Sequence, residues 1–140
     1  PAMAARGDGC IITVSSTAGV RPFPRETAYC ASKYALEGLV RSLALEAAGR
    51  GVSVTLATPG RRTKPTSMTE AEFAALPPEA QAAHAPPEAF AEAFGYLAAA
   101  RNARLVGRRF DLWALAQLVR DEGWDVSPAR ALERAERDGA

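Results

Sequence analysis

Residues 10–14 read CIITV, residues 28–48 read AYCASKYALEGLVRSLALEAA and residues 52–56 read VSVTL, and these three segments decide the fold of the chain. The first and third are short, continuously apolar and rich in β-branched residues, which is typical of strands buried on both faces. The second has apolar residues at helical period and stops before Gly49. Two strands joined by a helix predict a right-handed βαβ unit with parallel strands.

Irregular stretches flank this unit. Residues 17–27 contain Gly19, Pro22 and Pro24 and predict a loop. Residues 61–87 are polar, proline-containing and alanine-rich, and predict a long variable loop with a hint of helix at 69–76.

Later segments predict further helices and one strand. We expect a helix over residues 87–100, and a third strand from Leu105-Val106 and Phe110–Leu112 around the turn at 107–109. Residues 114–140 predict a helical extension, with one helix to about Glu122 and another from Ser127, which would cap it. We therefore divide the chain into residues 1–113 and the extension 114–140.

The composition favours a globular domain without a strong charge preference. The chain has 140 residues, 48% of them hydrophobic, and a formal net charge of +1. Neither nucleic acid nor a membrane is an expected partner, because no strong basic excess and no apolar run of about 20 residues occurs. The two cysteines fit a reducing, cytoplasmic compartment, and the single His84 gives no basis for a metal site.

Three side chains form the main chemical candidate. Tyr29 and Lys33 are four residues apart, so on a helix they share one face. A phenol titrates near 10 in water, and a neighbouring ammonium favours its ionised form, which makes such a tyrosine a usable acid or base. Ser16 follows the first strand, and its hydroxyl can donate to a substrate carbonyl oxygen. A Tyr/Lys pair at this spacing is common by chance, so the case depends on the whole set.

The strings IITVSSTAG, AYCASKYALEGLVRSLALE and GVSVTLATPG resemble the second half of the short-chain dehydrogenase/reductase family. The resemblance covers residues 1–64 strongly and residues 105–112 weakly. Family members carry a serine thirteen residues before the tyrosine of a YxxxK motif and a Pro-Gly about thirty residues after it. Ser16, Tyr29 and Pro59 stand at these separations. The implied fold is a Rossmann-type doubly wound parallel sheet, present here in part, as the equivalents of its fifth, sixth and seventh strands.

The resemblance implies an oxidoreductase that uses NAD or NADP to interconvert a small carbonyl or alcohol substrate. Tyr29 matches the catalytic acid/base, Lys33 the lysine that binds the nicotinamide ribose and promotes ionisation of the tyrosine, and Ser16 the residue that polarises the carbonyl. Pro59 and Gly60 match the turn beside the nicotinamide. Thr63 is the nearest match to a threonine that contacts the carboxamide, although it comes one residue earlier than usual.

Two family features do not occur in this sequence: the glycine-rich turn that binds the pyrophosphate, and the segment with the catalytic asparagine. Because Pro1–Arg6 also read as the end of a helix, we expect the sequence to be truncated. The 140 residues alone should then be poorly soluble and inactive, with an unpaired edge on the first strand. The complete protein is expected to be a homo-oligomer.

Two alternatives differ in class from an enzyme. The first is a catalytically silent relative that binds a dinucleotide or a partner protein, which the retention of Ser16, Tyr29 and Lys33 disfavours. The second is a structural fragment that pairs with another chain, which a size measurement would test.

Overall fold

A three-stranded parallel sheet forms the centre of the computed structural model, which describes residues 1–100 and 102–137. The strands lie in the order β1-β2-β3 and span Gly9–Val14, Val52–Thr58 and Arg109–Asp111. β1 and β2 pair in parallel over six residues of each strand, and β3 pairs in parallel with the end of β2. All three carboxyl ends therefore face the same edge of the sheet.

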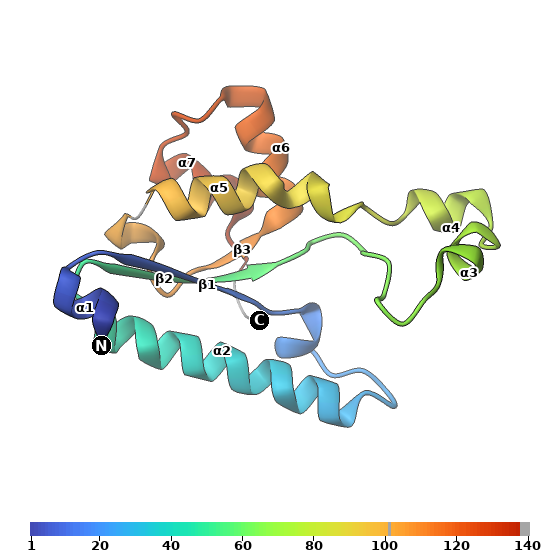
Figure 1. The fold of residues 1–140 in the computed structure, drawn as a ribbon, viewed down its shortest axis with the longest axis horizontal. Coiled ribbons are helices and arrows are strands. Elements are labelled where there is room, and N and C mark those ends of the chain that lie inside the picture. Colours follow the sequence, from blue (N-terminus) through green and yellow to red (C-terminus); the bar gives the residue numbers. More distant parts are fainter. Residues whose placement is uncertain (101, 138–140) are drawn as a thin grey trace.

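Helix α2 (Thr27–Ala47) covers one face of this sheet (Figure 1). Its buried side chains form a stripe at helical spacing, and Val40 and Ala44 of that stripe pack with Val54 and Leu56 of β2. Tyr34, Leu39 and Leu45 on the same helix are exposed. The helix thus runs across the sheet with one side in the core and the other in solvent.

Three helices cover the opposite face: α5 (Ala91–Ala100), α6 (Leu112–Glu122) and α7 (Pro128–Ala135) (Figure 1). They form the larger core cluster, in which Leu97, Phe110 and Leu115 are almost completely inaccessible. A parallel sheet with helices on both faces is the doubly wound α/β arrangement. The structure is part of a Rossmann-type fold, as the sequence predicts.

The remaining elements are short. They are α1 (Ala2–Arg6), η1 (Thr17–Gly19), α3 (Glu70–Ala74), α4 (Pro78–Ala82), η2 (Pro87–Phe90) and η3 (Ala103–Leu105). In Figure 1, α3 and α4 project from the body of the molecule on the side where β2 ends. We call residues 61–86 the α3–α4 arm.

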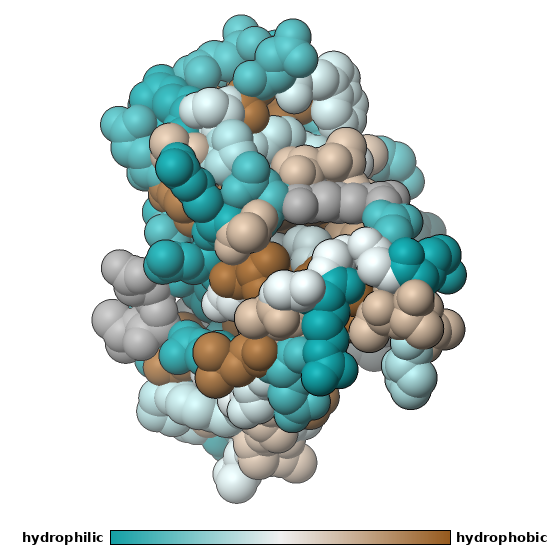
Figure 2. Space-filling model, turned by 90° about the vertical axis from the view of Figure 1, so that its left-hand side faces the viewer, coloured by the Kyte–Doolittle hydropathy of each residue, from teal (hydrophilic) through white to brown (hydrophobic). Residues whose placement is uncertain are grey.

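The molecular surface is mixed in character. Figure 2 views the molecule from the end where α1 lies, and apolar side chains there are interspersed with hydrophilic ones. Within the described ranges, no helix combines the length and the apolarity that crossing a bilayer requires.

The structure confirms the βαβ unit, the helix predicted near 87–100 and the helix capped by Ser127, whose hydroxyl accepts from the Arg130 amide at 3.2 Å. The predicted loop at 61–87 contains two short helices rather than one.

The third strand is shorter than predicted, because Leu105-Val106 and Leu112 are not part of it. The Asn102 side chain accepts from the Arg104 amide and starts a 3-10 turn, so Leu105 is buried from a turn rather than from a strand. The Asp111 carboxylate accepts from the Ala114 amide and starts α6 at Leu112. Apolar character alone therefore gave the wrong structure to these residues, because caps decide where the elements begin.

Candidate active site

The ends of β1 and β2 border an open cleft of about 490 Å³. The serine pair after β1 and the Pro-Gly turn after β2 approach it from the sheet, and α2 closes one side. Its lining includes all six residues singled out from the sequence, namely Ser16, Tyr29, Lys33, Pro59, Gly60 and Thr63. In open α/β sheets ligands bind beyond the carboxyl ends of the strands, and this cleft has that position.

Tyr29 and Lys33 lie in the first two turns of α2. The Tyr29 side chain is accessible, with 47% of the residue exposed, and the Lys33 ammonium lies 5.6 Å from the centre of its ring. Lys33 Nζ also donates to the carbonyl oxygen of Val14, the last residue of β1, at 3.0 Å. The ammonium thus links the helix to the end of the strand and stays beside the phenol.

Ser16 is held at the start of the turn η1. Its Oγ accepts from the Ala18 amide at 3.2 Å, and its carbonyl oxygen accepts from Arg109 Nη2 at 3.0 Å. The Ser16 hydroxyl therefore keeps its own proton free to be donated into the cleft.

The Pro59-Gly60 turn needs glycine at its second position. Gly60 has φ +69°, and a Cβ there would overlap the Asp111 carboxylate. The Pro59 carbonyl accepts from the Trp113 amide at 3.2 Å, which fixes the turn to the start of α6. Glycine accepts both this left-handed conformation and the close approach of the Asp111 carboxylate.

Thr63 lies in the cleft lining together with Arg61 and Arg62. The Arg61 guanidinium stacks on the ring of Trp113 at 4.6 Å and donates to the Ala82 carbonyl at 2.5 Å. Arg61 thereby ties the α3–α4 arm to the rim of the cleft.

Sequence reasoning missed the buried charges behind the cleft. Glu37 and Arg109 form an ion pair of 3.1 Å, and each side chain is only 7% exposed. The available signal was Glu37 itself, a carboxylate within the otherwise apolar stripe of α2. The sequence gives no sign that its partner lies 72 residues away.

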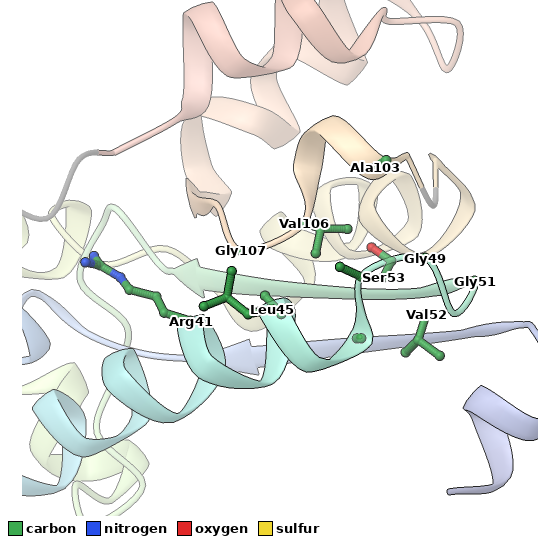
Figure 3. A pocket seen from close by; sticks show the side chains of 12 residues that line it. Arg41, Leu45, Gly49, Gly51, Val52, Ser53, Ala103, Val106 and Gly107 are labelled. Atoms are coloured by element: carbon green, nitrogen blue, oxygen red, sulfur yellow. The ribbon is translucent and has the colours of Figure 1, made fainter.

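A larger cavity of about 670 Å³ lies at the other end of the sheet (Figure 3). It is formed by the end of α2, the start of β2 and residues 103–107, and among its described lining residues Arg41 alone has an ionisable side chain. Since acid/base chemistry needs converging polar groups, the smaller cleft is the better candidate despite its size. No group of three metal-binding side chains occurs in the described part of the chain.

Comparison with known proteins identifies the family. The family model for short chain dehydrogenases matches residues 1–76, which is more than half of the chain and includes Ser16, Tyr29, Lys33 and the Pro-Gly turn. The chain belongs to the short-chain dehydrogenase family. Among members of this family, dehydrogenase/reductase SDR family member 4 of Bos taurus is 50% identical over 60 residues, 43% of this chain and 22% of that protein.

Other members of the family are similar over comparable lengths. A 3beta-hydroxysteroid dehydrogenase of Mediterraneibacter gnavus is 39% identical over 66 residues, 46% of this chain and 24% of the relative. A solved structure of a putative NAD(P) dependent gluconate 5-dehydrogenase from Beutenbergia cavernae, with bound NADP at low occupancy, is 32% identical with a TM-score of 0.62. That alignment covers 77% of this chain and 45% of the solved one, so the chain spans less than half of the relatives it matches.

Proposed function

We propose that this chain carries the proton-transfer centre of an NAD(P)-dependent oxidoreductase that interconverts a small carbonyl compound and its alcohol. One observation carries the proposal: Ser16, Tyr29 and Lys33 line a single cleft at the carboxyl ends of the parallel strands. A hydroxyl donor, a phenol and an ammonium together are the groups that carbonyl reduction and alcohol oxidation need.

The donor set suits the nicotinamide riboside part of the cofactor. Lys33 Nζ and the hydroxyls of Tyr29 and Thr63 can hold ribose hydroxyls and a carboxamide, and the Pro59-Gly60 turn lines the same cleft. When bound, the nicotinamide supplies or accepts the hydride. The relative from Beutenbergia cavernae, crystallised with NADP, supports this choice of cofactor.

The chain's own residues handle the oxygen and its proton. In reduction, the Ser16 hydroxyl donates to the substrate oxygen and stabilises the charge that builds on it as the carbon gains the hydride. The Tyr29 phenol then gives its proton to that oxygen, and Lys33 stabilises the phenolate left behind until solvent returns a proton. In oxidation the phenolate accepts the alcohol proton as the hydride leaves.

The complete protein, in this proposal, adds an amino-terminal half that binds the cofactor's phosphates and pairs with β1. The 140-residue chain by itself is then inactive. The exposed Tyr34, Leu39 and Leu45 on α2 are suited to contact a second copy in a homo-oligomer. Cys10 and Cys30 are not joined to each other, which fits a reducing cytoplasm.

Isotope transfer tests the reaction. The complete protein, with this chain joined to the amino-terminal half of the fold, is incubated with carbonyl compounds and NADH or NADPH deuterated at C4. We expect deuterium at the carbinol carbon of at least one product, detected by mass spectrometry. A protein that binds the reduced cofactor yet transfers no deuterium to any of a broad panel of aldehydes and ketones would contradict the proposal and favour a silent dinucleotide-binding relative.

A further inference from the structure

Glu37 occupies a place in α2 that helical spacing assigns to an apolar residue. The buried positions of the helix are Cys30, Glu37, Val40, Ala44 and Ala47, and Glu37 is only 5% exposed among them. Burying a carboxylate is costly unless it is paired and hydrogen-bonded. The contacts of Glu37 therefore need an explanation.

Two side chains from other elements pair with one oxygen of this carboxylate. Glu37 Oε1 accepts from Ser15 Oγ at 2.6 Å and from Arg109 Nε at 3.1 Å. Ser15 and Arg109 are themselves 2% and 6% exposed. The end of β1, the middle of α2 and the start of β3 are thus joined at one buried point.

Arg109 extends this connection to the cleft. Its Nη2 donates to the Ser16 carbonyl at 3.0 Å, so Ser16 is held through its main chain while Ser15 is held through its side chain. The Ser15 amide also donates to the Ala57 carbonyl of β2 at 2.7 Å. The backbone that presents the Ser16 hydroxyl is therefore fixed from both sides.

The same helix connects this cluster to the other two candidate residues. Lys33 lies four residues before Glu37, and Tyr29 lies four residues before Lys33. Tyr29, Lys33 and Glu37 therefore lie about one turn apart along one side of α2, and the helix fixes their positions relative to one another. The contact of Glu37 with Ser15 and Arg109 therefore connects the helix that carries Tyr29 to the backbone that carries Ser16.

Gly19 closes the cluster on the side of the turn η1. A Cβ built at Gly19 would lie 2.7 Å from Ser15 Oγ and 3.1 Å from Glu37 Oε1. The backbone of this turn therefore packs directly on the hydrogen bond between Ser15 and Glu37.

We propose that Glu37, through Ser15, and Arg109, through the Ser16 carbonyl, are positioning residues that hold the Ser16 hydroxyl in the cleft with Tyr29. The inference rests on the proposed function, because it assigns Ser16 a part in the reaction. A buried ion pair is often no more stabilising than an apolar pair of equal volume. We expect the main effect of this pair to be on the position of the backbone at Ser15 and Ser16, directly after β1.

The test compares two serines in the complete protein. Ser15→Ala removes the hydroxyl that donates to Glu37, and the control Ser53→Ala removes a hydroxyl on β2 that is equally buried but has no hydrogen-bond partner in the structure. We expect Ser15→Ala to lower kcat about tenfold, because small displacements of reacting groups are costly in rate. The KM for the cofactor should match that of Ser53→Ala, whereas the melting temperature should be lower, because Ser15→Ala removes a hydrogen bond to a buried carboxylate.

A second variant removes the buried ion pair without leaving an unpaired charge in the interior, since Arg41, which lies 3.8 Å from the other oxygen of Glu37, is 53% exposed. The double variant Glu37→Leu/Arg109→Met should fold and keep the KM for the cofactor unchanged. Its kcat should fall by at least as large a factor as that of Ser15→Ala. An unchanged kcat in Ser15→Ala overturns the inference, as does a loss of kcat that is matched by loss of cofactor binding. Ser15→Ala decides alone if the double variant does not fold.

A Tyr29→Phe variant of the otherwise unmodified complete protein distinguishes failure of the positioning role from failure of the proposed function. If Tyr29→Phe is inactive and Ser15→Ala is normal, the positioning role fails and the proposed function stands. If Tyr29→Phe remains fully active, the proposed function itself fails.

Discussion

Gly60 and Gly38 show at the residue scale how differently the fold uses the same amino acid. Gly60 has φ +69° and faces the Asp111 carboxylate, whereas Gly38 lies in α2 with no atom within 4 Å of where a Cβ would stand. The first glycine is required by the turn beside the cleft. The second only adds flexibility to a helix.

Alanine at these two positions should therefore act in opposite directions. We expect Gly60→Ala to destabilise the complete protein by about 1–3 kcal/mol, through strained backbone and overlap with Asp111. Gly38→Ala should stabilise it by about 0.5–1 kcal/mol, since glycine is a poor helix former. Urea unfolding of both variants measures this. Equal effects of the two substitutions would contradict the reading of the turn.

Single residues also mark the limit of what the sequence predicts about the site. Spacing predicts that Tyr29 and Lys33 share a helix face and that Ser16 follows a strand, and the resemblance to the family gives these residues their expected roles. The role of Arg109 is not predicted, because it depends on a contact with Glu37 across 72 residues of chain. Such contacts are set by how the elements pack, and no local pattern encodes them.

At the scale of elements, helix α3 in the arm depends on a capping box. The Thr69 amide and hydroxyl donate to the Glu72 carboxylate at 2.7 and 2.8 Å, and the Glu72 amide donates back to the Thr69 hydroxyl at 3.2 Å. The hydrogen bonds from the backbone and the hydroxyl of Thr69 hold the pKa of Glu72 below its usual value. The capping box therefore favours the ionised carboxylate.

The start of α3 should consequently loosen in acid. A carboxylate with a lowered pKa in the folded state contributes stability above its unfolded pKa, about 4.3, and loses that contribution as the pH falls through the lower folded value. NMR titration of the Glu72 carboxyl should give a midpoint below that of an unstructured glutamate, and Thr69→Ala should move it upward. A midpoint at the ordinary value in the unmodified protein would contradict the capping box.

The elements themselves were predictable where their periodicity is local. β1, α2 and β2 follow from apolar runs and helical spacing, and Ser127 marks the start of α7. The short strand β3 was misjudged in extent because Asn102 and Asp111 cap the neighbouring turns. Each of these caps consists of a single hydrogen bond. Such a bond shifts where a helix or strand begins, but it does not change the order of the elements along the chain.

At the scale of the whole molecule, β1 lies at one edge of the sheet and pairs only with β2 within the described residues. Val14, at its end, is 43% exposed. A parallel strand with apolar side chains is normally covered or paired on both sides. This geometry fits the proposal that another half of the fold, with the phosphate-binding turn, completes the sheet.

The cleft lies beyond the carboxyl ends of β1 and β2, and in our proposal catalysis there requires the complete protein. Tyr29 and Tyr34 offer a matched comparison there. Both lie on α2 and are similarly exposed, at 47% and 45%, but only Tyr29 lines the cleft with Lys33 and Ser16.

The most direct measurement is therefore the turnover of Tyr29→Phe beside that of Tyr34→Phe in the complete protein, with cofactor affinity measured for both. Tyr29→Phe should lose at least about a hundredfold in kcat while it still binds cofactor, because it lacks the proton that the substrate oxygen receives. Tyr34→Phe should remain within twofold of the unmodified protein. Undiminished turnover in Tyr29→Phe would contradict the account.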